Sequence, residues 1–215
     1  MPYSHRPPPK AVLFDWDNTL VDTMPLICAA INQTLAHFGM ESWSDQEIKQ
    51  KTQLSAKDSL PQYFGDLWPE ALTVYRGFYH KSHLKFLTPL PGALLLLQHL
   101  FEKNIPIGLV SNKGGPTLRK EVAHLKWEPF FSALIGAGDA IKDKPNPEPA
   151  LLALKTMGIK SAPTIWFVGD APVDWQCAEA SGCWPIPLGK CHPEANFYPQ
   201  AVKNCEDLEK ILSKL

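Results

Sequence analysis

Short runs of apolar residues alternate with longer segments of helical spacing over most of the chain. The first apolar run, Ala11–Phe14, is too short for a helix and is typical of a strand buried on both faces. Similar runs predict further strands at 105–110, 133–136, 164–168 and 184–188. Apolar residues at helical spacing predict helices over 93–103, 116–125, 147–158, 172–182 and 206–215. This alternation predicts an α/β fold, in which helices cover both faces of a parallel sheet.

Residues 24–86 depart from this alternation, because they contain helical patterns and no strand pattern. Helices are predicted over 25–38, 54–64 and 69–86. A further helix is predicted to begin after Ser44, since Glu47 three residues later completes a capping box. Residues 87–92 contain prolines and a glycine and are typical of a linker. The predicted domains are a core of 1–23 and 87–215 and a helical insertion of 24–86.

Composition and charge narrow the class of protein. The chain has 215 residues, of which 45% are hydrophobic and 20% charged, as in soluble globular proteins. A formal net charge of -1 offers no basic surface, so we expect neither nucleic acid nor a membrane as a partner. The first ten residues lack the apolar core of a signal peptide, and no apolar stretch is long enough to span a bilayer.

Cysteine usage favours a reducing compartment. The five cysteines are odd in number and contain no CxxC pair, so neither a disulfide framework nor a structural zinc site is indicated. Cys191 and His192 are adjacent, which is only a weak indication of metal binding. We therefore expect a cytoplasmic protein, and the sequence leaves its oligomeric state open.

Polar residues that could carry chemistry follow four of the predicted strands. They are Asp15, Asp17, Ser111, Lys144, Asp170 and Asp174. Because the carboxyl ends of parallel strands lie at one edge of a sheet, these side chains can converge on one crevice. Each also has an ordinary explanation, since Ser and Asp often cap helices and a lone lysine is usually solvated. Two acids as close as Asp15 and Asp17 nevertheless call for a cation nearby.

In combination, these residues resemble the motifs of the haloacid dehalogenase-like hydrolase superfamily. Its first motif, DxDx[TV], matches 15–19, and its second, a Ser or Thr after an apolar strand, matches Ser111. Its third, a lysine often followed by Pro-x-Pro, matches 144–147, and its fourth, GDxxxD, matches 169–174. Asn18 stands where a glycine is commoner, which we expect to alter turn geometry rather than chemistry.

The resemblance implies a Rossmann-like core and phosphoryl transfer through a covalent intermediate. Asp15 is implied as the nucleophile that forms an aspartyl phosphate. Asp17 is implied as the acid that protonates the leaving oxygen and then as the base that activates water. Mg²⁺ is implied as the cofactor, held by the carboxylates of Asp15 and Asp170 and the backbone carbonyl of Asp17.

The remaining motif residues are implied to hold the phosphate and the nucleophile. Lys144 is implied to be a catalytic residue that offsets negative charge and holds both Asp15 and the phosphate. Ser111 and backbone N–H groups such as that of Asn112 are implied to bind phosphoryl oxygens. Asp174 is implied to orient Lys144 or a metal-bound water without touching the phosphate. The insertion at 24–86 resembles the small helical cap of this family, which can close over the crevice.

The expected function is hydrolysis of a small phosphorylated metabolite by a Mg²⁺-dependent phosphatase. Asp17 argues against a carbon–halogen dehalogenase, which lacks the second acid of the first motif. Among capped relatives, the strings at 15–23 and 111–113 look most like those of phosphoglycolate phosphatases. A phosphosugar mutase similar to β-phosphoglucomutase shares every motif and stays an alternative. A binding protein on an inherited hydrolase scaffold is a further alternative, although no core acid or lysine is lost.

Overall fold

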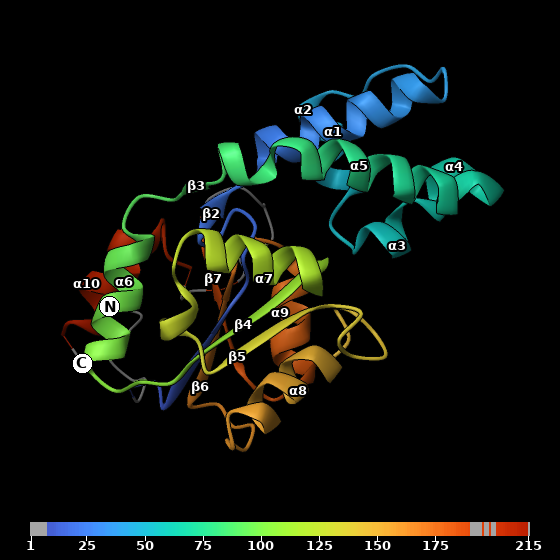
Figure 1. The fold of residues 1–215 in the computed structure, drawn as a ribbon. Helices are drawn as coiled ribbons and strands as arrows, with labels where there is room; N and C mark the ends of the chain where they lie inside the picture. Colours follow the sequence, from blue (N-terminus) through green and yellow to red (C-terminus); the bar gives the residue numbers. More distant parts are fainter. Residues whose placement is uncertain (1–7, 190–194, 196–197, 199–200, 215) are drawn as a thin grey trace.

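Figure 1 shows the protein as a computed structural model, which describes residues 8–189, 195, 198 and 201–214. Cys191 and His192, the weak metal indication, lie outside the described residues. None of the helices within the described ranges is long and apolar enough to cross a membrane.

The core is a five-stranded parallel sheet of order β5-β4-β1-β6-β7. Its strands are β1 (Ala11–Phe14), β4 (Ile107–Gly114), β5 (Ala133–Ala137), β6 (Ile165–Gly169) and β7 (Trp184–Pro187). The first strand is central, since Val12 pairs with Ile107 on one side and with Trp166 on the other. The predicted α/β class with a parallel sheet is therefore confirmed. Strand β7 forms despite its two prolines, because an edge strand needs few backbone donors.

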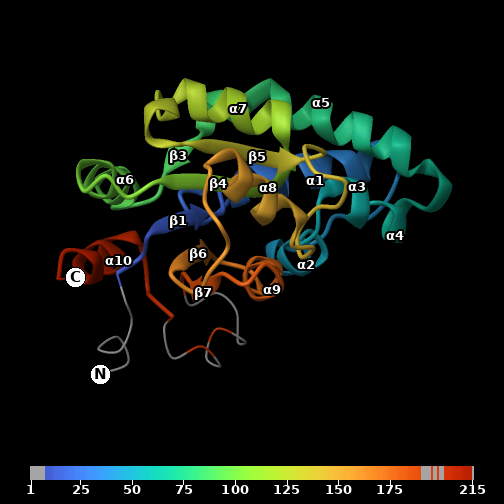
Figure 2. The ribbon, with the colours of Figure 1, turned by 90° about the horizontal axis from the view of Figure 1, so that it is seen from below.

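Two hydrophobic layers cover the two faces of this sheet, because side chains alternate along each strand. Val12 and Phe14 pack with helices α6, α7 and α10, whereas Ala11 and Leu13 pack with α8 and α9. The helices are α6 (Ala93–Glu102), α7 (Gly115–His124), α8 (Glu148–Thr156), α9 (Pro172–Ala180) and α10 (Cys205–Leu212). Figure 2 shows α7 and α9 on opposite sides of the sheet.

The segment between the first strand and the rest of the core is helical, as expected. It contains α1 (Met24–His37), α2 (Asp45–Lys51), α3 (Ala56–Ser59), α4 (Pro61–Phe64) and α5 (Trp68–Phe86), with a 3-10 turn at Gly65–Leu67. These helices share an apolar cluster of their own around Ile31, Leu35 and Phe64. Both views place them together at one end of the molecule (Figures 1 and 2).

Several details differ from the sequence expectations. The capping box at Ser44 forms, since Glu47 Oε2 accepts from the Ser44 N–H at 2.8 Å. The single helix expected over 54–64 is instead two short helices, because Pro61 begins a new one. An additional antiparallel pair, β2 (Val21–Asp22) with β3 (Thr88–Pro89), joins the two chain crossings between the core and the helical segment. Strand β4 also continues to Gly114 rather than ending at 110.

Candidate active site

The predicted site residues converge at the carboxyl edge of the sheet. Asp15 directly follows β1, Asp170 follows β6, and Ser111 lies within β4. Lys144 lies in the connection between β5 and α8, and Asp174 lies in the first turn of α9. The four motifs therefore meet in one place, as the parallel sheet predicted.

Lys144 is the charged centre of this group. Its Nζ lies 2.6 Å from Asp15 Oδ1 and 2.6 Å from Asp174 Oδ1, and it also donates to the carbonyl of Val110 at 2.9 Å. The side chain is buried. Burial alone would lower the pKa of Lys144, but the two carboxylates outweigh burial and raise it. Lys144 therefore stays protonated and bridges the nucleophile candidate to α9.

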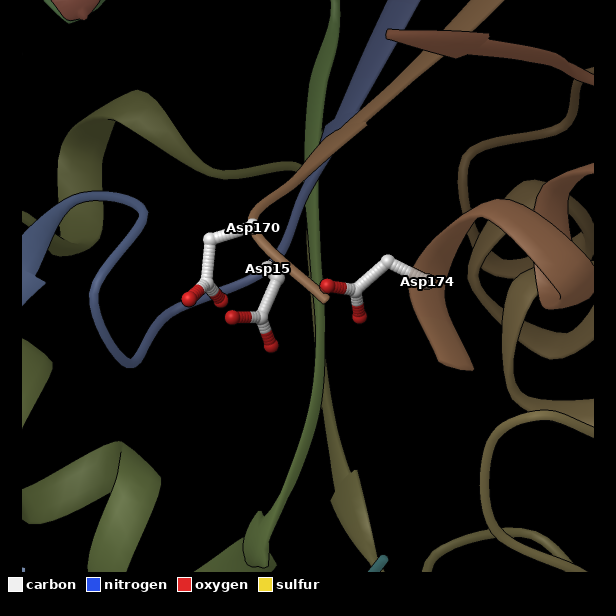
Figure 3. A group of neighbouring side chains, drawn as sticks. All are labelled: Asp15, Asp170 and Asp174. Atoms are coloured by element: carbon white, nitrogen blue, oxygen red, sulfur yellow. The ribbon is translucent and has the colours of Figure 1, made fainter. Parts of the chain in front are cut away.

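The acids nevertheless outnumber this lysine. Ligand oxygens of Asp15, Asp170 and Asp174 all lie within 4.8 Å of one another, and Figure 3 shows the three side chains turned toward one another. Burial raises the pKa of Asp15 to about 7, against the pull of Lys144 and with a push from Asp174 and Asp17. Burial, Asp174 and Asp15 raise the pKa of Asp170 well above its usual value. The site thus lacks positive charge.

Donors within the described residues satisfy two of these three acids. Asp174 accepts from Lys144 and, through Oδ2, from the Ala171 N–H at 3.0 Å. Asp15 accepts from Lys144 and, at 3.3 Å, from the Thr19 hydroxyl. No described residue donates to the buried Asp170 carboxylate. An unpaired carboxylate that lines the cavity beside Asp15 fits a divalent cation with oxygen ligands, so the residues present fit Mg²⁺.

Gly169, the last residue of β6 directly before Asp170, has no room for a side chain. A Cβ built on Gly169 would lie 2.4 Å from the Cβ of Asp174. Only the missing side chain lets β6 approach α9 closely enough for Asp174 to reach Lys144. At the turn after Asp17, by contrast, a residue other than glycine is present. Asn18 takes a left-handed conformation there, with φ 58°. Asparagine tolerates this region, so the departure from glycine leaves the turn in place.

Asp17 is held by a different lysine, Lys113. Its Oδ1 accepts from the Thr23 hydroxyl at 2.5 Å and from Lys113 Nζ at 2.5 Å. Lys113 also donates to Glu121 at 2.8 Å and to the Tyr79 hydroxyl at 2.7 Å. Burial alone would lower the pKa of Lys113, but Asp17 and Glu121 outweigh burial and raise it.

Ser111 and Asn112 lie beside the lysine, in different ways. Ser111 is buried, and its hydroxyl accepts from the Lys113 N–H at 3.1 Å. The Asn112 amide accepts from the Lys144 N–H at 2.9 Å and donates to the Lys144 carbonyl at 3.0 Å. The Asn112 side chain therefore fixes the loop that carries Lys144. Because this side chain is already engaged, only the backbone N–H of Asn112 could contact a phosphate.

The sequence interpretation missed Lys113, Glu121, Tyr79 and His83. Glu121 is fully buried, with Trp16 Nε1 at 2.7 Å, the Tyr79 hydroxyl at 3.0 Å and His83 Nδ1 at 2.8 Å. The only sequence signal was Lys113 in the Ser-Asn-Lys string, since a glutamate in a helix is ordinarily solvated. The partners lie far apart in the chain and meet only when α5 packs on α7.

A cavity of about 250 Å³ lies between the sheet edge and the helical segment. Asp15, Asp17, Lys144 and Asp170 line its floor. Apolar and cationic side chains of the helical segment line its other walls, including Ile27, Ile31, Leu60, Tyr75, Lys49 and Arg76. Lys57 Nζ of α3 reaches across to 3.8 Å from the otherwise unpaired Asp143 Oδ2. The cavity is therefore lined by both parts of the chain and has the size of a small ligand.

Several solved structures share this architecture. One named a Had-superfamily hydrolase, from Ehrlichia chaffeensis, is 32% identical, with a TM-score of 0.70 and coverage of 98% of both chains. One named a putative phosphoglycolate phosphatase, from Lactobacillus delbrueckii, has a TM-score of 0.86 at 20% identity and covers 96% of this chain and 99% of that chain. The second likeness concerns the fold alone.

Sequence relatives extend over most of the chain. A protein named pyrophosphatase PpaX from Bacillus pumilus is 32% identical over 173 residues, which are 80% of each chain. A phosphoglycolate phosphatase from Yersinia pestis is 28% identical over 182 residues, covering 81% of this chain and 78% of its own. The sequence model of the haloacid dehalogenase-like hydrolase family matches residues 12–186. By this match and by its arrangement of acids around Lys144, the chain belongs to the haloacid dehalogenase-like hydrolases.

Proposed function

We propose that this protein is a Mg²⁺-dependent phosphatase that hydrolyses a small phosphomonoester through an aspartyl phosphate. The observation that carries the proposal is the position of Lys144 between Asp15 and Asp174, beside an Asp170 carboxylate that no described residue satisfies. This arrangement holds Asp15 as the nucleophile, and the single positive charge of Lys144 does not balance the three carboxylates around it. A phosphate dianion can enter such a site only together with a cation.

In the first step, a carboxylate oxygen of Asp15 forms a bond to phosphorus while the bond to the leaving oxygen breaks. Asp17 gives its proton to that oxygen, so the product leaves as a neutral alcohol. In the second step, Asp17 takes a proton from water, whose oxygen attacks phosphorus as the bond to Asp15 breaks. Inorganic phosphate leaves, and both side chains return to their starting forms.

Three further residues hold the reacting groups in place: Lys144, Ser111 and Asn112. Lys144 already bonds Oδ1 of Asp15, which fixes the nucleophile and offsets the charge that the phosphate adds. The Ser111 hydroxyl and the backbone N–H of Asn112 are assigned to phosphoryl oxygens. Asp174 holds Lys144 from the other side and takes no part in bond breaking.

Asp15 and Asp170 through their carboxylates, with the backbone carbonyl of Asp17, are the residues that would hold Mg²⁺. The bound ion supplies positive charge to the oxygens that gather negative charge during transfer. Asp174 contributes indirectly, because both of its oxygens already accept hydrogen bonds from this chain.

The size of the cavity supports a small substrate. A volume of about 250 Å³ is below the usual range for drug-sized ligands. We assign residues 24–86 as a cap over a core of 1–23 and 87–215, which encloses the leaving group and excludes water. A polymeric substrate would hold such a cap open. The cytoplasmic location expected from cysteine usage stays a prediction.

The test is phosphate release from a panel of phosphorylated metabolites in the presence of Mg²⁺. 2-Phosphoglycolate and pyrophosphate come first, since relatives are named for activity on them. We expect a small phosphomonoester to be preferred over phosphoprotein and oligonucleotide. Glucose 1-phosphate tests the mutase alternative, because a mutase would return glucose 6-phosphate rather than free phosphate. No release from any compound would contradict the proposal.

A further inference from the structure

Glu121 is a buried charged residue that the proposed reaction does not use. Its carboxylate on α7 is fully buried, yet side chains from three other parts of the chain surround it. The Trp16 indole donates at 2.7 Å, the Tyr79 hydroxyl at 3.0 Å and Lys113 Nζ at 2.8 Å, and His83 Nδ1 lies 2.8 Å away. A buried carboxylate is costly unless it is paired and hydrogen-bonded in this way. The Glu121 carboxylate is therefore held in one position by its hydrogen bonds, and it fixes the side chains that donate to it.

The groups that Glu121 anchors are the neighbours of the candidate acid. Trp16 lies between Asp15 and Asp17 in the chain, so its indole fixes the loop that carries both. Lys113 Nζ spans the gap between Glu121 Oε2 at 2.8 Å and Asp17 Oδ1 at 2.5 Å. The charge of Glu121 also offsets that of Lys113, so the lysine can sit in this nearly buried position.

The contacts of Asp17 are one-sided. Lys113 and the Thr23 hydroxyl both donate to Oδ1, and no donor among the described residues reaches Oδ2. Two donors on one oxygen fix the rotation of the carboxyl group. They leave Oδ2 of Asp17, a residue lining the cavity, for exchange of a proton with a ligand.

We propose that Lys113, held by Glu121, is a positioning residue that orients Asp17 for proton transfer to the leaving oxygen. This inference rests on the proposed function. Lys113 touches neither phosphorus nor the leaving oxygen in this assignment, and it acts through Asp17. An ion pair with only a structural role would show the same contacts. Its loss, however, would lower kcat/KM for every substrate by the same factor.

The experiment compares esters whose leaving groups differ in basicity and carry no second charge. An alkoxide such as that from ethyl phosphate needs a proton as it leaves, whereas p-nitrophenolate does not. The measured quantity is kcat/KM, which ends at formation of the aspartyl phosphate and so excludes the later attack of water. Phenyl phosphate supplies an intermediate point, so that the dependence on leaving-group pKa can be fitted.

We expect Lys113→Met to lower kcat/KM for ethyl phosphate about 100-fold, and for p-nitrophenyl phosphate less than about threefold, within the usual range of general acid catalysis. Asp17→Asn should show the same split, and adding Lys113→Met to it should change little. Glu121→Gln should show a smaller split of the same direction, and Lys113→Arg should recover part of the loss. Lys120→Met, an exposed lysine on α7, is the matched control.

Removing Lys113 alone leaves Glu121 without one of its donors and could unfold the chain. The double variant Lys113→Met/Glu121→Gln removes both charges and should give the same split. An equal fall for all three esters in the folded variants would overturn the positioning role while leaving the phosphatase proposal intact. A wild-type protein that releases phosphate neither from these esters nor from any compound of the metabolite panel would overturn both.

Discussion

The ammonium of Lys144 lies 2.6 Å from Oδ1 of Asp15, and both residues are buried. At this distance between buried groups, the pair is a strong, charge-assisted hydrogen bond. The bond holds the Asp15 carboxylate in a single orientation in the absence of any ligand.

The first prediction concerns Lys144. Lys144→Met should lower kcat by about 10³-fold or more, because Asp15 is no longer held and the charge that develops during phosphoryl transfer is no longer offset. It should also lower the free energy of unfolding by about 3–5 kcal/mol, because Asp15 and Asp174 lose a buried partner. Lys142→Met, at an exposed position, should change neither quantity. Similar behaviour of the two variants would contradict the assignment of the third motif.

The second prediction concerns the covalent route. Asp15→Asn keeps the size of the side chain and removes the nucleophile, so turnover should fall to background while the fold is kept. Acid quenching of the wild-type protein during turnover should yield a fraction heavier by one phosphoryl group in intact-mass spectrometry. The adduct should be absent from Asp15→Asn and present in Asp66→Asn, whose carboxylate is exposed on the helical segment. Turnover by Asp15→Asn without reversion to Asp would exclude this route.

The third prediction concerns metal binding and pH. EDTA should abolish turnover, and Mg²⁺ should restore it. Since burial raises the pKa of Asp15 to about 7, the metal-free protein carries a proton there at lower pH that the ion must displace. The apparent Mg²⁺ affinity should therefore rise with pH through about 7, by about tenfold per unit for each proton released.

Calorimetry in buffers of different ionisation enthalpy measures this proton release directly. At pH 6 the wild-type protein should release protons on binding Mg²⁺, and at pH 8 it should release fewer. Asp170→Asn should bind Mg²⁺ far more weakly, whereas Asp66→Asn should bind it normally. Full turnover in chelator, or a Mg²⁺ affinity that does not change with pH, would contradict the assigned ligands.

The fourth prediction concerns closure of the helical segment. Lys57 Nζ lies 3.8 Å from Asp143 Oδ2, a buried oxygen with no hydrogen bond of its own. Lys57→Glu places like charges there and should favour a more open cavity. We expect kcat/KM for the preferred small substrate to fall by about tenfold. Lys81→Glu, an equal charge change at an exposed position of α5, should have little effect. Equal effects would argue that only net charge matters.

The convergence of the motif residues was predictable from the sequence, for a simple reason. A parallel sheet brings all of its carboxyl ends to one edge, so Asp15, Ser111 and Asp170 had to meet once the strands were identified. The order of the motifs along the chain then added Lys144. The helical nature of 24–86 was likewise visible from its spacing of apolar residues.

The Glu121 cluster was not predictable in this way. Its partners belong to different elements, and nothing in the local sequence separates Glu121 from a solvated helix residue. Its burial follows from the packing of α5 against α7, which is a tertiary event. The pair of β2 and β3 was missed for the opposite reason. Each strand has two residues, too few to show any periodicity.

The central position of β1 has a consequence for how the protein folds. Val12 pairs with Ile107 and Trp166, so β1 can be paired on its two sides only by strands that lie much later in the chain. Contacts of such long sequence separation are slow to form. Asp15 follows this strand and pairs with Lys144, so a chain that has not reached Lys144 cannot yet hold the Asp15 carboxylate in place. The Asp15–Lys144 pair therefore forms only after β1, β4 and β5 have all been made.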